Sequence, residues 1–325
     1  MLRAWGIGFT ALDDRLDPGT IRRMASATPQ VSAWRGLAVY LVLTFALAWL
    51  PAFLLRDVLS GVTRGFSHQL LAASLLYAVT MGWQPLAASW VVRRWVEPPG
   101  PGDSGLHPAR FSYNVLATFA PLVLAGAALL SAWGLHELRR YTGPLELPIP
   151  RAPHAPVRSL PAALVMTLAF FASLLLIWLQ ALAEEVGWRG YFLTRLMRQL
   201  GPWEGLLLHG LFWGLWYAPP LLLMADAPGS APLPLHGVPF VLTCTLLGAL
   251  LGWLRLASHS VIPTTIANAV LTLSAGLPLL LQGVEVGPRG AAYGPPGWLP
   301  MGLVLAAIAL GRCRHAVKLP EHSTP

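Results

Sequence analysis

The sequence predicts an all-α fold: a polytopic membrane helical bundle of about eight transmembrane helices. Charged residues make up only 11% of the 325 residues, whereas soluble globular proteins carry about 25%. Apolar residues make up 55%. Several stretches of about 20 residues contain no charge, and this is the length that an α-helix needs to cross the hydrocarbon layer.

The uncharged stretches place the predicted transmembrane helices in chain order. The first four cover residues 36–55, 70–92, 114–135 and 159–183. The next three cover residues 205–224, 237–254 and 260–282. The eighth covers residues 298–310, and because this is short for a span we expect it to begin earlier or to lie at the membrane interface. Segments rich in Pro and Gly separate the helices, since these residues do not continue a helix.

The helices divide the chain into four parts. Residues 1–35 form a cytoplasmic N-terminal tail, residues 36–158 hold helices one to three, residues 159–282 form a core of helices four to seven, and residues 283–325 hold the last helix and a cytoplasmic C-terminal tail. No internal repeat is visible, which argues against a transporter built from inverted repeats. No short apolar core of a cleavable signal lies near the start, and Met24 is an alternative first residue.

The distribution of basic residues predicts the orientation in the membrane. The net charge is +8. If the N-terminus is cytoplasmic, 15 of the 22 Lys and Arg residues fall on the cytoplasmic side and the loop 225–236 has none. This asymmetry predicts cytoplasmic N- and C-termini in an inner or plasma membrane, with the lipid bilayer as partner. No basic stripe interleaved with aromatic residues indicates nucleic-acid binding.

The chemically richest segment follows the fourth predicted helix, at Glu184-Glu185-Val-Gly-Trp-Arg189. Ionised groups beside the hydrocarbon layer are costly and need partners. Glu185 and Arg189 stand four residues apart on a helix, in the order that favours an ion pair. Glu184 points about 100° away on the same helix and can face a cavity. The alternative is that these charges only cap a helix at the membrane surface.

This segment resembles the first motif of the CAAX protease and bacteriocin-processing (CPBP or Abi) family of intramembrane endopeptidases. Residues 211–220 resemble its second motif and residues 260–272 its third, so the resemblance covers about residues 160–276. It implies that a Glu and two His residues bind a metal or activate water. That water attacks a peptide bond, and an Asn stabilises the oxyanion.

The sequence departs from this pattern at three positions. Tyr217 stands where the second motif has His, Asn268 where the third has His, and Thr272 where the third has Asn or Asp. Tyr has a pKa near ~10, and a neutral amide oxygen suits hard cations better than zinc. The resemblance thus implies zinc or another divalent metal, but its ligands are missing, and we predict no metal site and no other cofactor.

Other histidines are not expected to replace the missing ones. His209 lies eight residues before Tyr217, about 12 Å along a helix, and His259 lies nine residues before Asn268. We expect His209 to hydrogen-bond a neighbouring helix and His259 to lie in a loop. If the family's packing holds, Tyr217 and Asn268 surround Glu184 and hydrogen-bond its carboxylate.

Two functions stay open from the sequence. In the first, Glu184, Glu185 and Arg189 are catalytic residues of an intramembrane endopeptidase that cleaves a membrane-associated peptide or protein through Glu-activated water, with activity reduced or lost. In the second, the chain is a pseudoprotease that binds a peptide or bacteriocin as an immunity or accessory protein.

Overall fold

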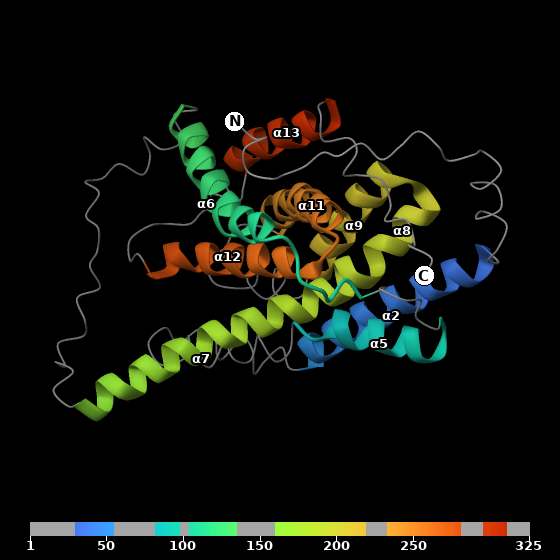
Figure 1. The fold of residues 1–325 in the computed structure, drawn as a ribbon, viewed down its shortest axis with the longest axis horizontal. Helices are drawn as coiled ribbons and strands as arrows, with labels where there is room; N and C mark the ends of the chain where they lie inside the picture. The colour runs from blue at the N-terminus through green and yellow to red at the C-terminus, as the bar shows by residue number, and fades with distance from the viewer. Residues whose placement is uncertain are drawn as a thin grey trace.

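The computed structural model describes residues 30–54, 82–97, 104–134, 160–218, 233–280 and 295–310, and its regular elements are all helices (Figure 1). In chain order they are α2 (Gln30–Leu54), α5 (Gln84–Trp95), α6 (Phe111–Gly134), α7 (Leu160–Glu185), η3 (Val186–Phe192), α8 (Leu193–Leu200), α9 (Pro202–Trp216), α11 (Leu233–Ser258), α12 (Val261–Leu280) and α13 (Pro295–Leu310). The predicted all-α membrane bundle is confirmed.

Most predicted helices correspond to one observed helix. α2, α6, α7, α11 and α12 match the first, third, fourth, sixth and seventh predicted segments within a few residues. The last helix begins at Pro295, before the predicted residue 298, as its short length required. The second segment is represented by α5, which begins at Gln84, and residues 70–81 of that prediction lie outside the described residues.

The region after α7 contains a helix for which the sequence analysis made no prediction. Residues 193–200 form the short helix α8, which continues directly from η3. The fifth predicted helix is represented by α9, which ends at Trp216, and residues 219–224 of that prediction lie outside the described residues. The backbone of Tyr217 leaves the helix with φ −76° and ψ 3°.

Three described helical segments are long and apolar enough to cross a membrane on their own: Trp34–Leu54, Phe111–Ala128 and Gly237–Ser258. Val261–Ser274 and Pro296–Leu310 are apolar but shorter. α7 is 26 residues long and carries its first charge at Glu184. In Figure 1, α7 slants into the bundle, and its C-terminal end lies near α12.

Helices α9 and α11 pack closely against each other at positions where both carry glycine. A Cβ atom built on Gly248 of α11 would lie 2.5 Å from the Cα atom of Gly210 in α9, and one built on Gly210 would lie 2.6 Å from the carbonyl oxygen of Thr245. Gly214 and Gly252 each stand one turn further along, so both helices present a Gly-x-x-x-Gly spacing. Such pairs of small residues let membrane helices approach closely, and this approach brings α9 into the bundle centre.

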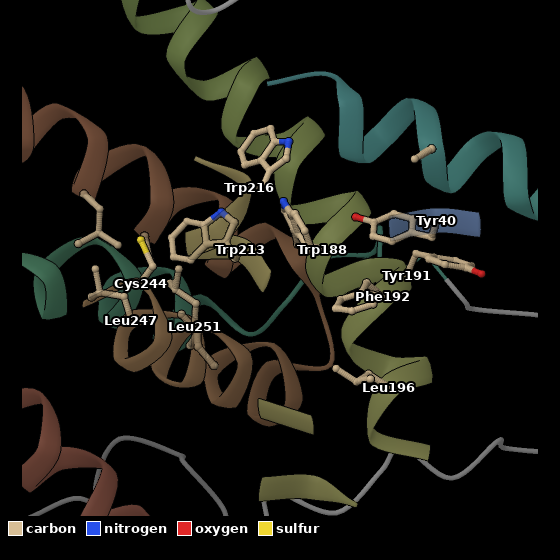
Figure 2. Close-up of a cluster of buried hydrophobic side chains, with 14 of the residues drawn as sticks. Tyr40, Trp188, Tyr191, Phe192, Leu196, Trp213, Trp216, Cys244, Leu247 and Leu251 are labelled. Atoms are coloured by element: carbon tan, nitrogen blue, oxygen red, sulfur yellow. The ribbon is translucent and has the colours of Figure 1, made fainter. Parts of the chain in front are cut away.

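The centre of the bundle is aromatic (Figure 2). The ring of Tyr40 in α2 stacks on Phe192, with centroids 5.3 Å apart, and meets Trp188 edge-on at 5.7 Å. Trp188 in turn contacts Trp216 of α9 at 6.0 Å. These rings tie α2, η3 and α9 together beside the Glu184–Glu185 segment.

Candidate functional site

The helix that carries the candidate residues changes its winding at the site. α7 passes without a break into a π-helix, η3, at Val186, and returns to α-helix at Leu193. A π-turn widens the helix locally and is common at functional sites. Its two glycines allow close packing, since Gly187 lies against the backbone of Pro85 in α5 and a Cβ atom on Gly190 would lie 2.7 Å from the Ser104 carbonyl oxygen.

Glu185 and Arg189 form the ion pair that their spacing predicted. Arg189 Nη1 donates to Glu185 Oε1 at 2.7 Å, and both side chains are fully buried. The guanidinium also lies over the ring of Trp213, with Cζ 4.3 Å from the ring centroid. The alternative that these charges merely cap a helix at the membrane surface is therefore wrong for this pair, because it lies inside the bundle.

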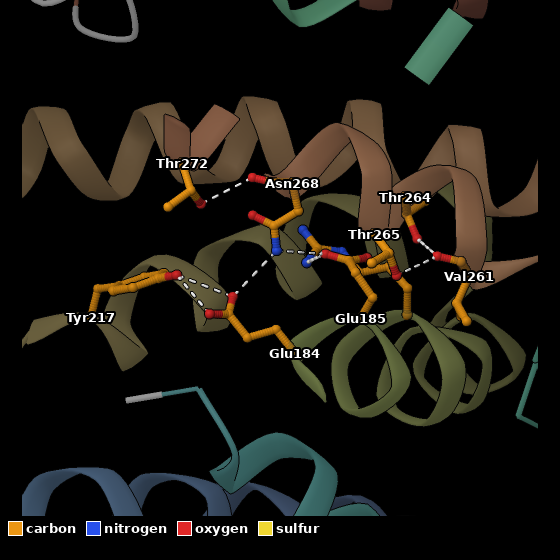
Figure 3. A network of polar contacts seen from close by, with 9 residues as sticks. Glu184, Glu185, Tyr217, Val261, Thr264, Thr265, Asn268 and Thr272 are labelled. Carbon is orange, nitrogen blue, oxygen red and sulfur yellow. Dashed lines mark hydrogen bonds and ion pairs between the residues drawn. The ribbon is translucent and has the colours of Figure 1, made fainter. Parts of the chain in front are cut away.

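Glu184 faces Tyr217 at the end of α9 and Asn268 in α12 (Figure 3). The Tyr217 hydroxyl donates to Oε2 at 3.1 Å and lies 3.3 Å from Oε1. Asn268 Nδ2 lies 3.4 Å from Glu184 Oε2 and donates to Glu185 Oε1 at 3.0 Å, so one amide group bridges the two carboxylates. Glu184 is 3% exposed. The expected hydrogen bonds from Tyr217 and Asn268 to a buried Glu184 are thus present.

Thr272, the third departure from the family pattern, does not contact Glu184. Its hydroxyl donates to the carbonyl oxygen of Asn268 at 3.0 Å, which is a bond within its own helix. It therefore helps to shape the α12 backbone near Asn268 but adds no donor to the carboxylates.

The sequence reading missed two further residues of this site. Thr264, one helical turn before Asn268, lies close to Glu185, and its hydroxyl donates to the carbonyl oxygen of Val261. Arg255, at the end of α11, is buried and acts electrostatically on Glu185. The spacing of 264, 268 and 272 on one helix face was a signal for Thr264, whereas Arg255 lies on another helix, α11, and no spacing within α12 indicates it.

The two histidines behave differently. His259 lies in the turn between α11 and α12 at φ 57°, as predicted for a loop residue. Partial burial lowers its pKa, and the charge of Arg255 and the nearby His107 lower it further, so the imidazole is neutral at pH 7. His209 is fully buried, but within the described residues neither of its ring nitrogens has a hydrogen-bond partner. The expected bond to a neighbouring helix is not found.

The side chains around Glu184 do not fit a zinc ion. Within the described residues, no three His, Cys, Asp or Glu side chains gather in a way that could hold a metal. The groups nearest Glu184 are a phenol and an amide, and zinc sites are built from imidazole, thiolate and carboxylate ligands. The chemistry of this site therefore depends on the Glu184 carboxylate and its hydrogen-bond donors.

Comparisons with known proteins support the resemblance. Residues 165–274 match the family model "Type II CAAX prenyl endopeptidase Rce1-like", a range that falls inside the segment carrying the three motifs. The chain is also 27% identical over 146 residues to CAAX prenyl protease 2 from Methanococcus maripaludis. That alignment covers 43% of this chain, and the chain spans half the length of this curated relative. The resemblance to the CAAX protease and bacteriocin-processing family is thereby confirmed, and it rests on residues 165–274, which are similar to Rce1-like CAAX endopeptidases.

Proposed function

We propose that this chain is an endopeptidase-like membrane protein that binds a membrane-associated peptide at Glu184, Tyr217 and Asn268 and hydrolyses it slowly or not at all. One observation carries the proposal. The residues that occupy the positions of the two family histidines donate hydrogen bonds to the carboxylate of Glu184. They hold that carboxylate in place instead of holding a metal.

The chemistry of these donors argues against fast hydrolysis. A general base must reach the proton that it removes from water, and a pair of imidazoles normally helps to position and polarise that water. Here the Tyr217 hydroxyl and the Asn268 amide both point at Glu184. Neither group ligates zinc well, and a phenol with a pKa near ~10 does not shuttle protons readily at neutral pH.

The same arrangement supports peptide binding. A carboxylate has about four acceptor positions, and Tyr217 and Asn268 use only part of this capacity on Glu184. A main-chain N–H of a peptide would complete it. The curated relative is a protease by name, so a peptide is the ligand class that the family similarity favours.

A slow endopeptidase is the second candidate, and the geometry of Tyr217 favours it. Its hydroxyl lies 3.1 Å from Glu184 Oε2, next to the Asn268 amide. Glu184 would take the proton of an attacking water while the hydroxyl or the amide donates to the developing oxyanion.

The test uses the purified full chain in detergent and three measurements: metal content, cleavage of quenched-fluorescence peptides, and photo-crosslinking to a membrane-associated peptide. We expect crosslinking without cleavage, and weaker crosslinking for Glu184→Ala. Cleavage by the wild type that is lost in Glu184→Ala would show the endopeptidase instead. Stoichiometric zinc would overturn the argument from the missing ligands.

A restoration variant sharpens this test. Tyr217→His combined with Asn268→His and Thr272→Asn returns the family's residue types to the three positions. If those positions are what limits catalysis, the triple variant should bind zinc and gain cleavage that a further Glu184→Ala change removes. The Thr272→Asn single variant, which leaves both donors to Glu184 intact, is the control and should gain neither.

A further inference from the structure

The face of α5 that points out of the bundle is aromatic and has an arginine near its end. Trp90 is 59% and Trp95 64% exposed, and Arg94 is exposed beside them. The two indole rings meet edge-on, with centroids 5.1 Å apart. The opposite face packs inside the bundle and carries Gln84 and Ser89. A helix with polar side chains inside and indoles outside is suited to contact with lipid.

The first turns of α2 present a second tryptophan and arginine. Trp34 is 45% exposed, and Arg35 is exposed next to it. The segment Trp34–Leu54 is apolar and 21 residues long, which is about the length that crosses the hydrocarbon layer. The Arg35 guanidinium therefore lies in the first turn of a membrane span, at the depth of the lipid headgroups, where indole side chains are also enriched.

Packing between α2 and α5 brings these two helix ends together. The helices lie side by side (Figure 1). A Cβ atom built on Gly36 would overlap the carboxylate of Glu97, so the start of α2 lies directly against the residues that follow α5. Arg35 immediately precedes Gly36, and Arg94 lies three residues before Glu97. Both pairs of exposed side chains are therefore at the same end of these helices. We call Trp34, Arg35, Arg94 and Trp95 the Trp–Arg surface.

Two neighbouring arginines make contacts inside the protein instead. Arg195 Nε pairs with Glu97 Oε2 at 2.5 Å, and its Cζ atom lies 3.9 Å from the ring centroid of Tyr191. Arg93 Nη2 donates to the Gly190 carbonyl oxygen at 3.3 Å. Because Arg195 balances the charge of Glu97, the Trp–Arg surface keeps the positive charge of its own two arginines.

The chemistry of this surface selects its ligand. A guanidinium presents N–H donors in a planar fork that matches a phosphate group, and indoles pack against lipid while they donate to its polar part. Two adjacent cations favour a headgroup that adds no positive charge of its own. We propose that the Trp–Arg surface binds an anionic phospholipid, with its phosphate held by Arg35 and Arg94 and its acyl chains along Trp90. This inference does not rest on the proposed function.

Native mass spectrometry of the detergent-purified full chain, titrated with phosphatidylglycerol or phosphatidylcholine of the same acyl chains, tests the proposal. We expect tighter binding of phosphatidylglycerol, and Arg35→Gln and Arg94→Gln should each weaken it about fivefold. Arg110→Gln is the matched control, because it removes the same charge from an exposed position at the start of α6. Equal binding of the two lipids, or an equal loss in the control, overturns the proposal. A dimer that needs Arg94 and excludes lipid also overturns it and assigns the surface to a second copy of the chain.

The unfolding temperature gives a second readout that separates lipid binding from folding. A ligand that binds only the folded chain raises its unfolding temperature. Phosphatidylglycerol should therefore stabilise the wild type and Arg110→Gln more than phosphatidylcholine does. The Arg35→Gln, Arg94→Gln double variant should unfold at the same temperature in both lipids. In phosphatidylcholine it should match the wild type, because both side chains are exposed. A double variant that phosphatidylglycerol still stabilises as strongly as the wild type overturns the proposal.

Discussion

Glu185 and Arg189 form a buried ion pair, so each of the two charges relies on the other for its partner. Removing the cation alone, as in Arg189→Met, leaves a carboxylate buried without its main partner. We expect a loss of about 3–5 kcal/mol in the free energy of unfolding, the usual cost of breaking a buried pair. The Glu185→Gln, Arg189→Met double variant should recover much of that loss. Denaturant titration of helicity in detergent measures both, and a double variant as unstable as the single one would contradict the expected coupling.

Substitutions at Tyr217 and Thr272 should differ in how much they lower the free energy of unfolding, although both residues depart from the family pattern. Tyr217→Phe removes the hydroxyl that donates to Glu184, and a hydrogen bond to a charged group contributes about 1.5–3 kcal/mol. Thr272→Val removes a bond to its own helix backbone and should change the free energy of unfolding by less than about 1 kcal/mol. Thermal unfolding of the two variants side by side is the measurement. A larger effect at Thr272 would mean that it, and not Tyr217, supports the site.

At the scale of single residues, the sequence predicted the contacts that depend only on spacing within one helix. The four-residue separation of Glu185 and Arg189 predicted their ion pair. The contacts of Glu184 with Tyr217 and Asn268 followed from the resemblance, because they join three helices. The environment of His209 was predicted wrongly. Its neighbours Trp188 and Phe192 come from η3, and no pattern within α9 identifies the helix that an imidazole will face.

At the scale of helices, α9 and α11 cross closely because Gly210 and Gly248 have no side chains where the helices meet. Gly248→Ala would place a Cβ atom 2.5 Å from the Gly210 Cα atom, and neither backbone can move without separating the helices. Overpacking of this kind costs about 1–3 kcal/mol. Gly126→Ala in α6 is the matched control, because a Cβ atom there meets nothing within 4 Å, and alanine favours a helix over glycine by about 1 kcal/mol. Gly248→Ala should lower the unfolding temperature and Gly126→Ala should not.

The ends of the elements were harder to predict than their existence. The length of a stretch without charged residues limits where a membrane helix can lie, and the bounds of α7 are close to the predicted ones. It does not reveal that the helix rewinds into a π-turn at Val186, because this depends on Pro85 and Ser104 packing against Gly187 and Gly190. The two prolines after residue 218 could have indicated that α9 ends near Trp216. The prediction relied instead on the length of the apolar stretch alone.

At the scale of the whole molecule, the structure places together helix ends that the count of Lys and Arg residues predicts to lie on one side of the membrane. Arg195 of α8 pairs with Glu97 after α5, at 2.5 Å, and Arg93 Nη2 donates to the Gly190 carbonyl oxygen. The amide of Val261, at the start of α12, donates to the Gly105 carbonyl oxygen at 2.9 Å. The end of α5, residues 104–107, α8 and the α11–α12 turn therefore share one end of the bundle.

The placement of this end and of both termini in the cytoplasm stays a prediction from the distribution of basic residues. The test is the labelling of single cysteines in intact cells with a membrane-impermeant maleimide, after Cys244 and Cys313 are changed to Ala. Ser230→Cys, in the loop 225–236 that has no basic residue, should be labelled from outside. Ser323→Cys, near the C-terminus, should react only after the membrane is broken. The reverse pattern would invert the topology, and the basic residues would then lie on the external side against the positive-inside rule.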